Sequence, residues 1–191
     1  MTDRPLNATA ASLLGFLHNG PQTGWDLVAT AEREIGDFWS ITQSQVYREL
    51  TAMAEVGLVT AGERGRRDRR PYTITDAGRS AFAAWVAQPP GPELIRFPLL
   101  VTILFGAHIP PETLAAHVEH HRDIHAQRLA QYEQHRKAAD DAPPGYGPGV
   151  YVVAALDFGL RYERAVLEWF DALPAEISGE RGRGRKRPRS R

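Results

Sequence analysis

Residues 42–75 read TQSQVYRELTAMAEVGLVTAGERGRRDRRPYTIT, and this stretch decides the fold that the sequence predicts. Val46, Leu50 and Met53 recur at spacings of four and three, which gives a helix one apolar face. Polar residues occupy the opposite face of that helix. The stretch is therefore predicted to begin with a helix that packs on one side and presents a polar side outward.

The ends of this helix and the strands after it are also visible in the sequence. Thr42 can cap the helix, because its hydroxyl can accept a hydrogen bond from an unpaired backbone N–H group, and Gly57 can end it. Residues 58–60 and 71–75 are rich in strand-forming side chains and flank a basic segment that contains glycine. A helix followed by two strands with a basic tip is the arrangement of a winged helix-turn-helix.

Both the helix and the basic tip carry side chains that are suited to binding DNA. The helix presents hydroxyl, amide and guanidinium groups, which pair with base edges. The tip, residues 63–70, has five arginines against two acidic residues and can neutralise phosphates. The alternative is a hairpin with a solvated charged turn, but the position of the tip directly after a capped helix favours DNA. The predicted DNA-binding residues are Thr42, Ser44, Gln45, Tyr47, Arg48, Arg64, Arg66, Arg67, Arg69 and Arg70.

The formal net charge is zero, but the charge is unevenly distributed. Residues 180–191 hold seven basic residues and one acidic residue, so this tail carries +6 and the rest of the chain carries −6. Affinity for double-stranded DNA must therefore come from local basic patches. The tail has no apolar residue and is predicted to be disordered; it either contacts phosphates or serves solubility.

Composition bounds the class of protein. A chain of 191 residues can form one or two small domains with a sizeable core. The absence of cysteine excludes disulfides and thiolate metal sites and suits the reducing cytoplasm. The N-terminus lacks the apolar core of a signal peptide, and the most apolar run, residues 99–107, is too short to span a membrane. We expect a soluble cytoplasmic protein that has no membrane partner.

Two further helices are predicted before the quoted stretch. Asn7 and Thr23 can cap them, and the second helix is expected at residues 24–35. Phe38 and Trp39, which lie between that helix and the next, are predicted to pack in the core, although they could also line a ligand site. A fourth helix is expected after the hairpin.

A proline-rich break at residues 88–92 marks the predicted domain boundary. Three helices are expected beyond it, and Pro98 either kinks the first of them or lies in its first turn. The predicted fold class is mainly α, with an N-terminal winged helix-turn-helix of three helices and a two-stranded wing and a C-terminal all-helical dimerisation domain. The predicted limits are residues 1–88 for the winged-helix domain, 89–175 for the helical domain and 176–191 for the disordered basic tail, with the later helices at about 93–107, 110–139 and 150–173.

The last helix has two apolar lines about a quarter turn apart, which is too wide an arc for one neighbouring helix. We therefore predict that it packs on its own domain and on a second subunit, which would give a homodimer suited to a palindromic operator. Burial within one subunit is the alternative. The predicted dimerisation residues are Val152, Leu156, Gly159, Tyr162, Val166, Trp169 and Leu173.

Two side-chain groups in the helical half suggest a metal site and an effector pocket. His117, His121 and His125 have the one-turn spacing that can hold zinc or nickel, but no acidic residue at a fixed spacing completes a set. A polar helix face is the better interpretation, and no metal or other cofactor is expected. An effector pocket could be lined by Phe97, Phe105, Phe158, Tyr162 and Trp169, although helix-spaced aromatic residues usually form a core.

The first half contains, in order, LN at 6–7, LLG at 13–15, GPQTGWDL at 20–27, FWS at 38–40, QVYREL at 45–50, GLV at 57–59 and YTITDAG at 72–78. With these motifs in this order, the first half resembles the PadR family of bacterial transcriptional regulators. The second half is similar, more loosely, to the long helical dimerisation domain of one branch of that family, beginning with IRF at 95–97. The first half departs from the family pattern at two places. At residues 23–25 the family usually has His-Gly-Tyr, and at Ser44-Gln45 it usually has a pair that contains glycine.

The resemblance implies a dimeric winged-helix repressor that is often released from DNA by a small aromatic effector, with Tyr47, Arg48 and the wing arginines at the DNA. Two other functions remain open, a transcriptional activator and a winged-helix module that binds protein. An enzyme is not expected, because the sequence has no phosphate-binding glycine loop, zinc-hydrolase pattern or nucleophile elbow.

Overall fold

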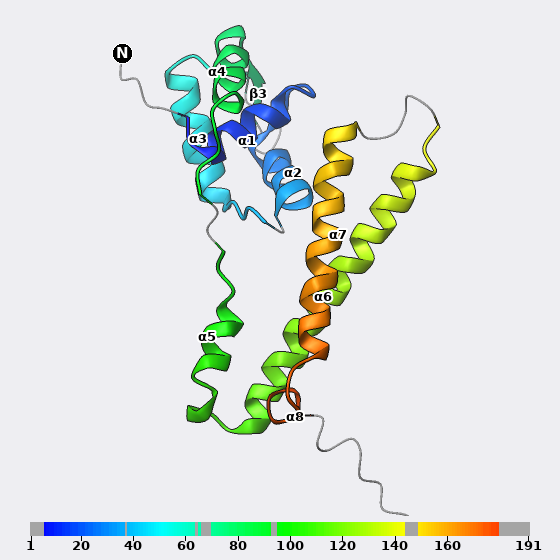
Figure 1. The fold of residues 1–191 in the computed structure, drawn as a ribbon. Helices are drawn as coiled ribbons and strands as arrows, with labels where there is room; N and C mark the ends of the chain where they lie inside the picture. Colours follow the sequence, from blue (N-terminus) through cyan, green and yellow to red (C-terminus); the bar gives the residue numbers. More distant parts are fainter. Residues whose placement is uncertain are drawn as a thin grey trace, which may run out of the picture. The chain divides into compact units, whose positions relative to one another are not determined.

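The computed structural model describes residues 6–36, 38–63, 65, 70–92, 95–143 and 149–179. The chain divides into two compact units, Met1–Glu93 and Leu94–Arg191 (Figure 1). Each unit has its own cluster of buried apolar side chains. We call them the winged-helix unit and the helical unit and describe each by itself.

The winged-helix unit has the predicted helices and hairpin and one strand more. Its sheet has the order β1-β3-β2, with both neighbouring pairs antiparallel. The additional strand, β1, is two residues long, which is too short to produce an alternating pattern in the sequence. The elements are α1 (Ala8–Leu17), β1 (Gln22–Thr23), α2 (Gly24–Ile35), α3 (Gln43–Glu55), β2 (Val59–Ala61), β3 (Pro71–Ile74) and α4 (Asp76–Val86).

Side-chain caps fix where these helices begin. The Oδ1 atom of Asn7 accepts from the backbone N–H of Ala10 at 2.8 Å, as predicted for α1. Thr23 and Thr42 form capping boxes at α2 and α3, and Thr75 caps α4. The caps of α1, α2 and α3 stand at the residues that the sequence predicted, so local chemistry determines where these three helices begin.

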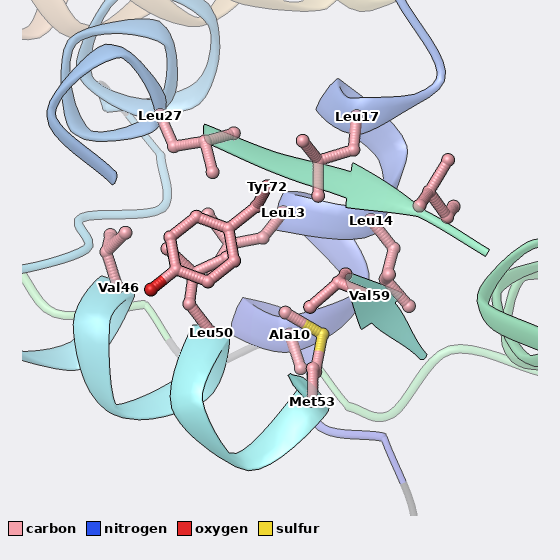
Figure 2. Close-up of a cluster of buried hydrophobic side chains, with 11 residues drawn as sticks. Ala10, Leu13, Leu14, Leu17, Leu27, Val46, Leu50, Met53, Val59 and Tyr72 are labelled. Carbon is pink, nitrogen blue, oxygen red and sulfur yellow. The ribbon is translucent and has the colours of Figure 1, made fainter. Parts of the chain in front are cut away.

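Three helices and two strands enclose the core of the winged-helix unit (Figure 2). Val46, Leu50 and Met53 bury the predicted apolar face of α3, and the ring of Tyr72 reaches over that face from β3. The remaining members of the core are Ala10, Leu13, Leu14, Leu17, Leu27, Val59 and Ile74. Burial of this apolar surface holds α3 in a fixed orientation.

The prediction that Phe38 and Trp39 pack in the core was wrong. Their exposed fractions are 70% and 44%. The chain turns tightly after α2, because the backbone N–H groups of both residues bond the carbonyl of Ile35. That turn directs both rings outward, and Ile41 packs against the core instead.

The helical unit begins with a short helix that starts at Pro98, so the proline occupies the first turn, one of the two predicted alternatives. The predicted helix from residue 93 is therefore shorter than expected. Beyond the last long helix, the structure has one more short helix where the sequence predicted the start of a disordered tail. The elements are α5 (Pro98–Leu104), the 3₁₀ helix η2 (Gly106–His108), α6 (Pro111–Asp140), α7 (Val150–Asp171) and α8 (Ala175–Ser178).

Helices α6 and α7 pack against each other with opposite chain directions and separate toward the N-terminal end of α7 (Figure 1). The Tyr132 ring of α6 packs directly on Gly159 of α7, since a Cβ atom there would lie 2.7 Å from Cε2 of that ring. Leu99 of α5, Leu114 and Val118 of α6, and Phe170 of α7 form the buried core. Among the residues that the structure describes, no helix combines the length and apolarity needed to cross a bilayer.

Candidate DNA interface

The N-terminal turn of α3 holds three of the predicted DNA-binding residues. The Oε1 atom of Gln45 accepts from the backbone N–H of Thr42 at 2.8 Å, and Thr42 Oγ1 accepts from the backbone N–H of Gln45 at 3.3 Å. Ser44 Oγ lies 3.1 Å from Thr42 Oγ1. These side chains therefore order the first turn of α3, a role that the sequence assigned to Thr42 alone.

Tyr47 and Arg48 follow on the outward side of the same helix. Tyr47 is 40% exposed, and its ring packs on the backbone of Gly24. The Arg48 side chain is 63% exposed, with Nη2 3.4 Å from Oε1 of the buried Glu49. An exposed guanidinium on an outward helix face can donate to base edges or phosphates.

The wing is the hairpin of β2 and β3, and one of its predicted DNA-binding arginines is described. Arg70 Nε donates to the backbone carbonyl of Gly62 at 3.0 Å, and its Nη2 donates to that of Ala61 at 3.4 Å. Arg70 thus ties together the two strands at the base of the tip while its side chain stays exposed. The other predicted wing arginines, Arg64, Arg66, Arg67 and Arg69, lie outside the described residues.

The predicted dimerisation residues occupy two environments on α7. Val166, Trp169 and Leu173 pack against the core of their own unit, and Gly159 faces Tyr132 of α6. The exposed members are Val152 and Tyr162, and Leu156 is half-buried.

The predicted effector-binding residues fall into two groups and one separate residue. The rings of Phe97 and Trp169 lie 5.9 Å apart beside the core. Phe158 and Tyr162 stack on the surface of α7 with their centroids 6.3 Å apart, and Phe105 is exposed after α5.

A buried histidine–glutamate hydrogen bond in the helical unit was not predicted from the sequence. His125 Nδ1 lies 2.5 Å from Glu163 Oε2, and both side chains are almost fully buried. Arg128 Nη1 lies 3.9 Å from the other carboxylate oxygen. The partners are 38 residues apart on different helices, so no fixed spacing reveals them. The sequence hinted at a buried Glu163 only by its place between Leu160 and Leu167 in an apolar line of the last long helix.

The pKa of His121, one turn before His125, is lowered from its ordinary value, first by burial and then by His120, His125 and His117. The ring of Phe97 contacts the rings of both His121 and His125. Within the described part of the chain, no group of three or more potential ligands is arranged to hold a metal ion.

An outward helix with an ordered first turn, beside a hairpin wing, defines the winged helix-turn-helix class of DNA-binding transcriptional regulators. Residues 13–84 match the transcriptional regulator PadR-like family, and residues 95–178 match a family described as virulence activator alpha C-term. The winged-helix unit therefore has the sequence signature of the PadR-like family of transcriptional regulators.

Three relatives illustrate this similarity. A probable transcriptional regulator of Mycobacterium tuberculosis, Rv1176c, is 25% identical over 89% of this chain and 97% of its own length. The negative transcriptional regulator PadR of Bacillus subtilis is 29% identical over 49% of this chain and 54% of its own length. Its crystal structure with operator DNA has a TM-score of 0.73 at 22% identity and covers 91% of this chain and 99% of that one.

The Bacillus subtilis protein has also been solved with p-coumaric acid; that structure has a TM-score of 0.64 at 21% identity and covers 90% of this chain and 98% of that one. The third relative is the virulence activator AphA of Vibrio cholerae, with a TM-score of 0.66 at 25% identity over 92% of this chain and 99% of that one. The fold is therefore shared along both units.

Proposed function

We propose that the protein is a dimeric transcriptional repressor that binds a palindromic operator and is released from it by a small aromatic molecule. The exposed polar face of α3 beside the wing carries the proposal. The relative named as a negative transcriptional regulator, whose solved structures contain operator DNA and p-coumaric acid, supports it. The protein would act by binding rather than by catalysis, in the cytoplasm.

For DNA binding, the proposal gives the helix and the wing different tasks. Tyr47 and Arg48 of α3 meet bases and phosphates, while Ser44 and Gln45 hold the first turn in place. Arg70 shapes the base of the wing, and the arginines of the tip neutralise phosphates. Two such surfaces, one from each subunit, would bind half-sites about one helical turn of DNA apart, or a multiple of it.

For dimerisation, the support is apolar surface that the chain itself does not cover. On α7, Tyr151, Phe158 and Tyr162 follow one another at helical spacing and are exposed, the first two by 87% and 68%. We call these three residues the α7 outer face. A second exposed apolar set lies on and directly after α5 and consists of Leu100, Val101, Leu104 and Phe105, the α5 outer face. A second copy is the natural cover for two such faces, because closed two-fold pairing buries the same surfaces on both subunits.

For release, we propose that the aromatic effector binds among the aromatic side chains of the helical unit. Phe97 and Trp169 form one ring contact there, and Phe158 and Tyr162 form another. An aromatic acid would have ring partners in either group. Thermal-shift measurements with p-coumaric acid and non-aromatic acids of similar size would test this part separately.

Activation of transcription is the second candidate, favoured by the similarity to the virulence activator AphA along both units. The same DNA-binding surface serves either outcome. Reporter expression with and without the protein distinguishes the two.

The test of DNA binding compares two arginines that are equally exposed. Arg48 on α3 and Arg33 on α2 have side chains that are both 63% exposed, and each forms an ion pair with the glutamate that follows it. We expect Arg48→Ala to weaken binding to a duplex selected from random sequence by about tenfold or more. Arg33→Ala should leave binding within about twofold, since it removes no proposed DNA contact.

Binding is measured by fluorescence anisotropy at several salt concentrations, against an unrelated duplex of the same length. The wild-type protein should prefer the selected duplex, and its affinity should fall steeply with salt. Equal affinity for both duplexes, together with a protein partner recovered in pull-downs, would instead support a protein-binding module.

A further inference from the structure

The first residue of α2 and the tyrosine of α3 meet where a glycine alone fits. A Cβ atom at Gly24 would lie 2.5 Å from Cε1 of Tyr47 and 2.8 Å from Cζ. Such separations are well inside van der Waals contact, so any larger residue at position 24 would displace the tyrosine ring. Gly24 is buried, whereas the other side of the Tyr47 ring reaches solvent. The backbone of α2 therefore acts as a stop against which the ring rests.

The stop is rigid, because the residues before Gly24 are tied to three elements. Strand β1 pairs with β3 of the wing. The Gln22 side chain donates to the backbone carbonyl of Phe16 in α1 at 3.0 Å and accepts from the Thr30 hydroxyl in α2 at 3.2 Å. The capping box of Thr23 fixes the first turn of α2. A larger side chain at position 24 would therefore move the ring rather than the backbone.

We infer that Gly24 is a positioning residue that sets where the Tyr47 ring lies relative to the wing. Strand β3 belongs to the wing, its partner β1 runs directly into Gly24, and Gly24 limits the ring of Tyr47. The distance between the wing and this point of α3 is thus set by one short connection. The inference rests on the proposed function, because the place of Tyr47 affects operator choice only if α3 reads DNA.

The physical consequence is preorganisation. A side chain that is already held in one position loses less rotamer freedom when it binds, so more of its contact energy appears as affinity. The ring is the far end of a side chain that can rotate, so Gly24→Ala should move it without unfolding the unit. The effect should therefore fall on operator binding more than on folding.

The first measurement tests the contact without DNA. Thermal unfolding is compared for wild type, Gly24→Ala, Tyr47→Ala and the double variant. Gly24→Ala should lower the Tm of the wild-type protein but not that of the Tyr47→Ala protein, where the added methyl group meets no ring. Gly15→Ala in α1, whose Cβ would lie 3.3 Å from the Phe82 ring, is the matched control away from α3.

The second measurement uses the duplex that the wild-type protein selects from random sequence and an unrelated duplex of equal length. Gly24→Ala should lower affinity for the selected duplex about tenfold and change affinity for the unrelated duplex much less. Tyr47→Ala should lose a similar factor, and the double variant should bind no more weakly than Tyr47→Ala. Gly15→Ala should bind like the wild type.

Each contrary result has a distinct meaning. If the losses of Gly24→Ala and Tyr47→Ala multiply in the double variant, Gly24 does not act through Tyr47 and the inference is wrong. If Gly24→Ala keeps full operator affinity while Arg48→Ala loses it, the inference is wrong and the proposed function stands. If the wild type does not distinguish the two duplexes, the proposed function fails and the role of Gly24 in operator choice fails with it.

Discussion

The two units of the chain differ in how many of their apolar side chains they bury in a core. Among the described residues of the winged-helix unit, eleven buried side chains form one continuous core, and Leu13, Leu14, Leu27, Val46 and Leu50 are completely inaccessible. In the part of the helical unit that the structure describes, four buried side chains form the core, and a histidine–glutamate pair is buried as well. Large apolar side chains remain exposed on both α5 and α7 of that unit.

This difference separates a unit with a large apolar core from one with a small core. Burial of apolar surface is the main favourable term in folding, so the winged-helix unit has its stabilising contacts within itself. The helical unit leaves comparable side chains in water, at the α5 and α7 outer faces. We expect its stability to depend on protein concentration, because association of a second copy would complete it.

The largest effects should come from matched truncations in the two units. Leu50→Ala removes a fully buried side chain and should lower the free energy of unfolding of the winged-helix unit by about 2–5 kcal/mol at every protein concentration. Phe158→Ala removes an exposed ring of the α7 outer face and should weaken the dimer about tenfold or more. Denaturant unfolding at several protein concentrations and sedimentation equilibrium measure the two effects.

The expected difference between the two units is wrong if Phe158→Ala leaves the dimer intact. It is also wrong if unfolding of the helical unit does not depend on protein concentration. Arg161→Ala is a suitable control, because Arg161 is an exposed residue of α7 whose pair with Asp157 lies within one helix. Exposed pairs of this kind contribute little, so this variant should dissociate like the wild type.

A smaller effect is expected at the buried pair of the helical unit. Glu163→Ala leaves the Nδ1 atom of His125 without its carboxylate partner and should lower the free energy of unfolding of the helical unit by about 2 kcal/mol. Glu163→Gln keeps an acceptor oxygen of the same reach, so it should cost less. The measurement is denaturant unfolding followed by circular dichroism.

Glu168→Ala, an exposed position on the same helix, is the control for helix propensity. If Glu163→Ala is as stable as Glu168→Ala, then the buried pair does not stabilise the helical unit. The stability of that unit would then come from the burial of its apolar residues alone.

Local signals were sufficient for most of the winged-helix unit. The caps at Asn7, Thr23 and Thr42, the apolar face of α3 and the left-handed glycine after it, Gly57, are each determined by residues within one turn. Such features can be predicted because the partners are close in sequence. Strand β1 was missed because its partner, β3, is about fifty residues away and its own two residues carry no pattern.

The candidate site was predictable in its residue types and less so in their tasks. Composition indicated that α3 and the wing suit DNA, but not that Gln45 serves the capping box, that Arg70 bonds the backbone of the opposite strand or that Gly24 limits Tyr47. Each of these depends on three-dimensional proximity. The same reason hid Glu163 as the partner of His125.

The smallest expected effect concerns the pH dependence of the helical unit. Burial, followed by repulsion from His120, His125 and His117, holds the pKa of His121 below its ordinary value of 6.5. The folded unit therefore binds this proton less readily than the unfolded chain. The resulting stability is fully present above pH 6.5 and is lost as the pH falls through the lowered pKa of the folded state.

His121→Gln removes this titration, so its free energy of unfolding should decline less than that of the wild type as the pH falls below 6.5. His135→Gln, at an exposed position farther along α6, is the control and should follow the wild type. Denaturant unfolding at a series of pH values measures the difference. Parallel pH profiles for the wild type and His121→Gln would mean that the histidines of α6 are too well solvated to influence one another. Burial in this region would then affect only His125 and Glu163.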